Sequence, residues 1–433
     1  MSTHRRMRHR ATLFTGIATT AVSILALTAC GSGSSGSGSD AADGDVTIEF
    51  AQWWEPELPD GEFRALIDTF EEENPGITVD LVSGPYASTK EQLFAGAASG
   101  TMPDVVGLDG AWVSDFAEQG VIADLTPLLE EAGFDDSQLV SQVKVDDSTY
   151  MVPVVNFVYP MFTNDELLAE AGVDAPPETR SEFADAAKSI SDLDGDAAGW
   201  VLPLSLEAPN GVQNDVMSWA WASGGTMLDD GQPDLTNDDV TSAVEFIGGM
   251  WDDDVIAPGS FTMKEQDKVE EFTNGRVGMM IDSLAHINLI RESNPDLAFS
   301  ISAVPAADDY TGERGIPYAS WGIGISENSE NKDAAAKLVS FLMSEETNSE
   351  LSTMANAFPG NTESVPAFVE DDDLFKDAFD IYQAGYPANE FVGLPVAEEL
   401  MRQLGAQLQS AFDGQQSLSE ALEKAQTEWE GEF

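Results

Sequence analysis

Short apolar runs alternate with amphipathic segments after residue 45, and this alternation constrains the fold more than any other feature. Residues 45–51, 77–82 and 104–109 have the pattern of strands, and residues 63–72 and 90–98 between them carry apolar residues at helical spacing. Strands that alternate with helices favour a largely parallel sheet covered by helices. The sequence therefore predicts an α/β lobe at the start of the chain.

The rest of the chain continues the same alternation. Further strands are predicted at 150–155, 277–281, 299–304 and 319–325. Helices are predicted at 165–171, 181–190, 215–223, 240–251, 264–272, 333–343, 397–412 and 418–429. A chain of 433 residues with a hydrophobic fraction of 42% and no internal repeat is long enough for two domains with cores of their own.

The first 45 residues have a different character and predict an export signal. Arg5, Arg6, Arg8 and Arg10 precede an apolar run at 11–27 that is too short to span a bilayer comfortably. Leu-Thr-Ala-Cys ends at Cys30, the single cysteine of the chain, and a Gly/Ser-rich stretch follows. We expect a signal peptide at 1–29 and a tether at 30–45. An exported chain with one cysteine has no internal disulfide, so its core alone must stabilise it.

The chain is strongly acidic, with 78 Asp and Glu against 19 Lys and Arg and a formal net charge of −59. Such a charge repels phosphate, which excludes nucleic acid as an expected partner and disfavours an anionic lipid surface. Two explanations stay open: binding of a cation, or a solvated acidic shell suited to high salt, as in halophilic proteins. We favour the shell because the acids are spread along the whole chain.

Several motifs occur in a defined order and carry a family resemblance. They include SGTMPDVVGLD (99–109), FTNGRVGMMI (272–281), SWGIGIS (320–326) and KDAAAKLVSFL (332–342). Together with the Leu-Thr-Ala-Cys30 sequence, which resembles a lipobox, they make the chain similar to extracellular solute-binding proteins of family 1. Members of this family are sugar-binding receptors of ABC importers. The resemblance covers nearly all of residues 46–430.

The resemblance implies a two-lobed, periplasmic-binding-protein-like α/β fold of type II, with a hinge between the lobes and ligand in the cleft. Residues 46–155 and about 306–352 would form the N-terminal lobe, and residues 156–305 and about 353–433 the C-terminal lobe. The implied function is capture of a carbohydrate, as an oligosaccharide or glycoside, and delivery to an ABC permease. The expected protein is a monomer without enzymatic activity or cofactor, lipid-anchored through Cys30 on the outer face of the cytoplasmic membrane.

Candidate ligand-binding residues are aromatic or polar side chains that follow predicted strands, because ligands of such sheets bind beyond the strand ends. Aromatic rings stack on the apolar faces of sugars, and planar polar groups bind the hydroxyls. Of the adjacent Trp53 and Trp54, at least one should face the cleft, and of Trp219 and Trp221 one should be core. The strongest candidates are Trp321, Asp109 and Trp54. The full set is Trp53, Trp54, Glu55, Asp109, Trp112, Asn156, Tyr159, Trp219, Trp221, Asp282, Tyr318, Ser320 and Trp321.

Other functions remain as alternatives. A receptor for a cationic solute, such as a polyamine or betaine, would also use aromatic rings with carboxylates. A secreted glycoside hydrolase would need an acid and a base at fixed separation, and a structural surface protein would show no ligand-induced closure. The stretch 192–196 lacks the glycine and glutamate of an EF-hand, and three histidines, two of them before residue 30, exclude a usual zinc site. We therefore expect no metal site.

Overall fold

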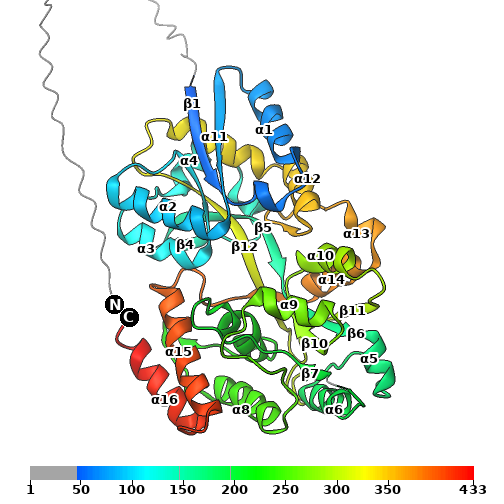
Figure 1. Ribbon diagram of the computed structural model, residues 1–433. Coiled ribbons are helices and arrows are strands. Elements are labelled where there is room, and N and C mark those ends of the chain that lie inside the picture. Colours follow the sequence, from blue (N-terminus) through cyan, green and yellow to red (C-terminus); the bar gives the residue numbers. More distant parts are fainter. Residues whose placement is uncertain (1–45, 146, 196) are drawn as a thin grey trace, which may run out of the picture. The chain divides into compact units, whose positions relative to one another are not determined.

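The computed structural model describes residues 46–145, 147–195 and 197–433. The predicted signal peptide and tether, with Cys30, lie outside the described residues. A sheet of eight strands and a sheet of four organise the described chain, and we call them the larger and the smaller sheet. Figure 1 shows both sheets with the helices that surround them.

The larger sheet has the strand order β13-β5-β12-β3-β1-β2, with β14 paired to β12 and β4 paired to β5. Strand β1 runs parallel to β2 and β3, whereas β12 runs antiparallel to β3 and β5. The parallel start predicted from the alternation is therefore confirmed. Its strands are β1 (Val46–Gln52), β2 (Ile77–Ser83), β3 (Val105–Leu108), β4 (Val143–Val145), β5 (Ser148–Val158), β12 (Gly315–Ile325), β13 (Phe358–Pro359) and β14 (Tyr386–Ala388).

The smaller sheet has the order β11-β6-β10-β7. Strand β10 runs antiparallel to β6 and parallel to β7. A separate two-stranded ribbon joins β8 (Leu228–Asp229) and β9 (Gln232–Pro233). The strands of the smaller sheet are β6 (Met161–Asn164), β7 (Ala198–Trp200), β10 (Val277–Ile281) and β11 (Phe299–Ser302).

Helices pack on both sheets. Helices α1, α2, α4 and α11 contact strands of the larger sheet, whereas α5, α6, α9 and α14 contact strands of the smaller sheet. The helices are α1 (Glu62–Glu73), α2 (Tyr86–Ser99), α3 (Val113–Glu118), α4 (Leu125–Glu131), α5 (Asp165–Glu170), α6 (Arg180–Ser191), α7 (Ser218–Trp221), α8 (Asp238–Asp252), α9 (Glu265–Thr273), α10 (His286–Ser293), α11 (Lys332–Leu342), α12 (Glu345–Ala355), α13 (Phe368–Asp371), α14 (Asp373–Ala384), α15 (Ala397–Phe412) and α16 (Leu418–Trp429).

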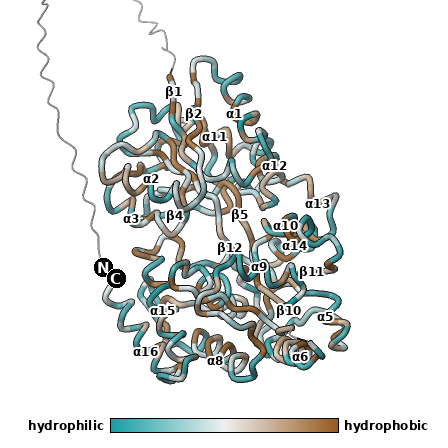
Figure 2. Tube along the Cα trace, in the orientation of Figure 1, coloured by the Kyte–Doolittle hydropathy of each residue, from teal (hydrophilic) through white to brown (hydrophobic). Residues whose placement is uncertain are grey.

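Apolar spacing in the sequence explains how these helices pack. The residues of α1 that fall at helical spacing, Phe63, Leu66, Ile67 and Phe70, are all buried. Figure 2 shows hydrophobic residues along the strands and hydrophilic stretches on outer helices such as α5 and α16. Within the described part of the chain, no helix is both long and apolar enough to cross a membrane.

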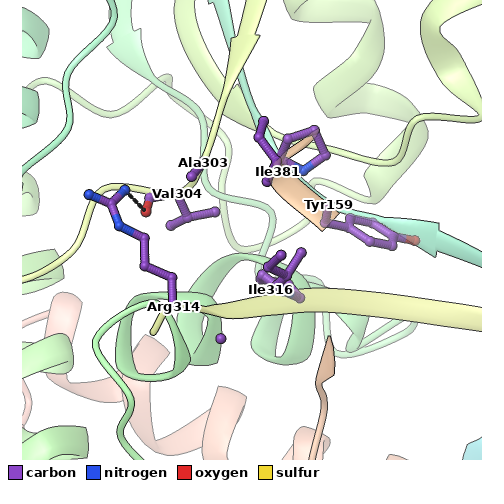
Figure 3. Close-up of a pocket in the computed structure, with 9 residues that line it drawn as sticks. Tyr159, Ala303, Val304, Arg314, Ile316 and Ile381 are labelled. Carbon is purple, nitrogen blue, oxygen red and sulfur yellow. Dashed lines mark hydrogen bonds between the residues drawn. The ribbon is translucent and has the colours of Figure 1, made fainter. Parts of the chain in front are cut away.

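The chain passes between the sheets through short crossovers. Strand β5 ends at Val158 and β6 begins at Met161, and the Tyr159 amide donates to the Pro317 carbonyl oxygen at 2.9 Å. A small cavity of about 10 Å³ lies here. Figure 3 shows the Tyr159 ring pointing away from Val304 and Arg314. The Arg314 guanidinium donates to the Val304 carbonyl oxygen at 3.3 Å, which ties the segment before β12 to the segment after β11.

One predicted helix and one strand of the larger sheet differ from what the sequence predicts. The predicted helix at 215–223 is a π-helical segment, Val212–Met217, followed by the single turn of α7. The π-helical segment has wider turns than an α-helix, and Asp215 within it is buried. Strand β13 pairs with β5 of the larger sheet although it lies beyond residue 352, where the sequence analysis ended the N-terminal lobe. The lobe boundaries stay a prediction.

Candidate functional site

A cleft of about 720 Å³ is lined by residues of the larger sheet and of the turns after its strands, by the π-helical segment, by the starts of α9 and α10, and by the chain from Asn389 into α15. Its aromatic wall consists of Trp53, Tyr86, Phe157, Tyr159 and Trp321. Its polar groups include Asp109, Asn210, Gln213, Glu265, His286 and Asn389. An enclosed space that combines apolar surface with a few polar groups is the usual form of a small-molecule site.

Trp321 and Trp53 are held rigidly by neighbouring rings. Trp321, on β12, stacks on Trp54 with ring centroids 5.6 Å apart and planes 8° apart, and Phe157 meets it edge-on at 5.0 Å. Trp53, directly after β1, contacts Tyr86 edge-on at 5.2 Å and Trp112 at 5.6 Å. Rings fixed in this way lose little conformational entropy when a ligand stacks on them.

Asp109 is placed by the turn that follows β3. Its side chain accepts a hydrogen bond from the Ala111 amide at 2.9 Å and another from the Tyr86 hydroxyl at 3.0 Å. Burial raises the pKa of Asp109 above its ordinary value, and these two hydrogen bonds oppose that rise. The carboxylate is thus fixed at the end of a strand of the larger sheet and faces the cleft.

A buried ionic cluster lies beneath the cleft, formed by side chains of α9, the π-helical segment and the residue after β10. Lys268, on α9, has no exposed surface, and its ammonium lies 3.2 Å from both carboxylate oxygens of Asp215 and 3.4 Å from Asp282. It also donates to the Ile281 carbonyl oxygen at 2.5 Å. Burial lowers the pKa of Lys268, but the carboxylates of Asp215 and Asp282 outweigh burial and raise it.

His286, at the start of α10, extends this cluster to the cleft surface. Its Nδ1 atom lies 2.8 Å from Asp282 Oδ2. Burial lowers the pKa of His286, but the Asp282 carboxylate outweighs burial and raises it to about 9. Glu265, the first residue of α9, lies close by and also lines the cleft. The cluster therefore draws positive charge toward this end of the cleft.

Five of the residues predicted from the sequence line the cleft: Trp53, Asp109, Tyr159, Ser320 and Trp321. All five lie on or directly after strands of the larger sheet. Trp53, Asp109 and Tyr159 follow β1, β3 and β5, and Ser320 and Trp321 lie on β12. Their role in binding a ligand stays a prediction.

The other aromatic candidates lie beside or behind the cleft wall. Trp54, a leading candidate, is fully buried under Trp321, and the cleft contains Trp53 instead. Trp112 is buried against Trp53 and Tyr86. Both rings therefore support the wall from behind and do not line it.

Trp219 and Trp221 correct a second expectation, that only one of them is core. Both are buried, with relative exposures of 0% and 1%. Trp219 packs among aromatic rings that include Phe183, and the Trp221 ring nitrogen donates to Glu390 at 2.9 Å. The single turn of α7 lies between β12 and α8, so both of its sides are covered.

The remaining polar candidates also lie off the cleft surface. Asn156 is buried and donates to the Pro359 carbonyl oxygen at 3.4 Å, and Glu55 accepts a hydrogen bond from Ser83. The Tyr318 carbonyl oxygen accepts from Asn389 at 2.8 Å. Asp282 lies beneath His286 and reaches the cleft only through it.

Sequence reasoning missed several residues that line the cleft. Tyr86 begins α2, and Gln213 and Asn214 lie on the π-helical segment. Asn389 and Glu398 come from the C-terminal part of the chain, far from the strand ends on which the prediction relied. His286 also lines the cleft, and only its pairing with Asp282, four residues earlier, could have signalled its position.

Comparison with known proteins agrees with this architecture. The sequence model of the bacterial extracellular solute-binding protein family matches residues 55–349. A binding protein of Brucella abortus is 29% identical over 307 residues, which cover 70% of this chain and 73% of that protein. The galactooligosaccharide-binding protein of Bacillus subtilis is 23% identical over 332 residues, or 74% of each chain.

The solved structure of a cyclic alpha-maltosyl-1,6-maltose binding protein from Arthrobacter globiformis has the same fold. It matches with a TM-score of 0.76 and 22% identity, over 90% of this chain and 99% of that one. The predicted two-lobed, periplasmic-binding-protein-like α/β fold is therefore confirmed. The family match spans more than half of the chain, and the chain therefore belongs to the family of bacterial extracellular solute-binding proteins.

Proposed function

We propose that the protein binds a carbohydrate in the cleft and delivers it to the permease of an ABC importer. The observation that carries this proposal is the pairing of fixed aromatic rings, Trp53 and Trp321, with planar polar groups, Asp109 and Asn389, around one cleft. The rings offer apolar surface to the C–H faces of a sugar, and the carboxylate and amide groups can bind its hydroxyls.

The relatives support a sugar as the ligand. The names of the Bacillus subtilis and Arthrobacter globiformis proteins state that they bind a galactooligosaccharide and a cyclic maltosyl-maltose, respectively. A cleft of about 720 Å³ lies within the range of roughly 300–1,000 Å³ that is usual for small-molecule sites. The names of these relatives call them binding proteins, and we expect no turnover of the ligand here.

Delivery would depend on contacts to one ligand from both sides of the cleft. Asp109 approaches the cleft from the larger sheet, whereas Gln213 approaches it from the π-helical segment and His286 from α10, which packs on α9. A ligand that touches both sides stabilises the closed arrangement by its extra contacts there. The permease would recognise that arrangement.

The same cleft gives a specific reason to test cationic solutes. Asp109, Glu265 and Glu398 line it together with aromatic rings, and rings with carboxylates bind quaternary amines well. Lys90 pairs with Glu398 and leaves Asp109 and Glu265 to face the ligand. A polyamine or betaine is therefore the second candidate.

We further propose that the mature protein is anchored by lipid on Cys30 and works outside the cytoplasmic membrane. The basis is the arginine-rich start, the apolar run and the Leu-Thr-Ala-Cys30 sequence. In cells that express the protein, Cys30→Ser should move it from the membrane fraction to the medium. Equal membrane retention of both forms would refute the anchor and leave the ligand proposal intact.

The test of function is a thermal shift screen of the mature chain carrying Cys30→Ser, in molar KCl, against mono- and oligosaccharides, polyamines and betaines. A true ligand raises the melting temperature in proportion to the logarithm of its concentration. The same shift should need about tenfold more ligand in Trp321→Ala and an unchanged amount in Trp251→Ala, since Trp251 stacks on Phe261 away from the cleft.

Each outcome of the screen decides between the candidates. Stabilisation by a sugar that chromatography recovers intact supports the proposal. Stabilisation only by an amine replaces the sugar with a cationic solute, and hydrolysis of the sugar would show an enzyme. A shift with the same dependence on sugar concentration in Trp321→Ala and in the wild type would refute the cleft as the site.

A further inference from the structure

Three side chains at one end of the cleft converge on a single point. Glu265, Asp282 and His286 each place one potential ligand atom within 4.8 Å of the other two. They come from three positions in the chain: the start of α9, the end of β10 and the start of α10. Glu265 and His286 line the cleft, whereas Asp282 lies beneath it with no exposed surface.

Two carboxylate oxygens in this group are buried without a hydrogen bond. Among the described residues, neither Asp282 Oδ1 nor Glu265 Oε1 has a hydrogen-bond partner. The Lys268 ammonium is 3.4 Å from Asp282 Oδ1, which is an ion pair without a hydrogen bond. A buried carboxylate oxygen without a donor is costly unless a cation or a donor completes it. The halophilic explanation does not apply here, because a solvated shell lies on the surface.

Acidic groups outnumber the ammonium around this point. Asp215, Asp282 and Glu265 are three acids, and Lys268 is the one lysine in the described ranges that pairs with them. The hydrogen bonds of Lys268 go to Asp215 and to the Ile281 carbonyl oxygen, so the ammonium is only partly available to Asp282. A divalent cation, bound to His286 in place of a proton, would meet the carboxylates of both Asp282 and Glu265 here.

We propose that Glu265, Asp282 and His286 form a binding site for a divalent transition metal ion of the Zn²⁺ or Mn²⁺ type. One imidazole nitrogen with two carboxylate oxygens suits these ions better than Ca²⁺ or Mg²⁺, which prefer oxygen ligands alone. Three protein ligands leave coordination positions open toward the cleft. Lys268 acts as a positioning residue that fixes Asp282 from behind.

This inference replaces the sequence expectation of no metal site. That expectation rested on the shortage of histidine and cysteine, which rules out only sites built from those residues. The carboxylates that complete the group are 17 residues apart in a chain with 78 acids, so no sequence pattern sets them apart. Only the folded chain brings Glu265 to the pair of Asp282 and His286.

The test is isothermal titration calorimetry with ZnCl₂ and then MnCl₂ on the full mature chain after treatment with a chelator, in molar KCl to screen the surface acids. We expect one ion per chain. Glu265→Gln and His286→Gln should each weaken binding about tenfold or more, and the matched cleft variant Asp109→Asn should change it less than about twofold. Circular dichroism confirms that each variant is folded.

Two results would overturn the site. Absence of binding in the chelated protein is the first, and binding of equal strength in the wild type and in both cluster variants is the second, because surface carboxylates would then hold the ion. A further arm rests on the proposed carbohydrate function: the stabilising sugar should bind more tightly with metal present. If metal binds but leaves sugar affinity unchanged, the metal site stands and its contact with the sugar is refuted.

Discussion

Replacing Lys268 with methionine tests the buried ionic cluster most severely. The lysine has no exposed surface, and its ammonium pairs with Asp215 and Asp282, whose side chains are 1% and 0% exposed. Methionine fills similar volume but leaves Asp215 buried without its counter-ion and leaves Asp282 with His286 alone. Breaking one partner out of a buried ion pair costs about 3–5 kcal/mol. That is a large share of the roughly 5–15 kcal/mol by which a typical protein is stable.

The assay is urea unfolding of chelated protein in molar KCl, followed by tryptophan fluorescence. We expect the midpoint to fall with an unchanged slope, which reports a loss of stability rather than a change in the surface exposed. Lys264→Met is the matched control, because Lys264 precedes the same helix and pairs with Glu207 at the surface. A surface pair of this kind contributes about 0–1 kcal/mol. Equal losses in the two variants would refute the cluster as a buried ionic network.

Four further predictions concern the cleft and its support. Trp321→Ala should weaken sugar binding about tenfold, or about 1.4 kcal/mol, because one stacking surface is lost, and unchanged affinity by calorimetry would contradict this. A double-mutant cycle of Tyr86→Phe and Asp109→Asn should show a coupling of about 1 kcal/mol in stability, since the Tyr86 hydroxyl donates to the Asp109 carboxylate. A coupling of zero would show that this hydrogen bond does not stabilise the protein. Burial raises the pKa of Asp109, and a sugar hydroxyl that binds its carboxylate needs the ionised form. Sugar affinity should therefore be highest above that pKa and fall as the pH drops through it. The variant Asp109→Asn should show no such fall. Asn348→Ala should lower the free energy of unfolding in urea by about 1–3 kcal/mol, because Asn348 donates to two buried carbonyl oxygens and accepts from the Asn361 amide. A smaller loss would show that these groups find other partners.

Much of the fold could be predicted from periodicity. The bounds of α15 (397–412) and α16 (418–429) coincide with the predicted helices, because both carry long amphipathic patterns. Ser417 also caps α16 in a reciprocal pair with Glu420, a local signal that the sequence displays. Elements whose pattern comes from local chemistry were predictable within a few residues.

The π-helical segment at 212–217 was not predictable from the same reasoning. Its extra residue per turn shifts the faces of the helix, so the spacing of Trp219 and Trp221 no longer reports which side is exposed. Coverage of α7 by both β12 and α8 then buries both rings. Tertiary packing decided this position, and it leaves no trace in the sequence.

The choice between Trp53 and Trp54 shows a similar limit. The last three residues of β1 are all buried, so the alternation of buried and exposed side chains is lost before the strand ends. The pattern therefore does not predict which of the next two side chains faces the cleft. Adjacent tryptophans indicated that one lines the cleft, but β12 determines which one, by stacking Trp321 on Trp54. The cluster around Lys268 was not predictable either, since its members come from α9, the π-helical segment and the residue after β10, which are far apart in the sequence.

The crystal structure of the complex with the most stabilising sugar tests the central claim most directly. We predict a sugar ring with its apolar face on Trp53 or Trp321 and a hydroxyl within hydrogen-bond distance of Asp109. A sugar bound elsewhere on the surface, with the cleft unaltered, would contradict the account.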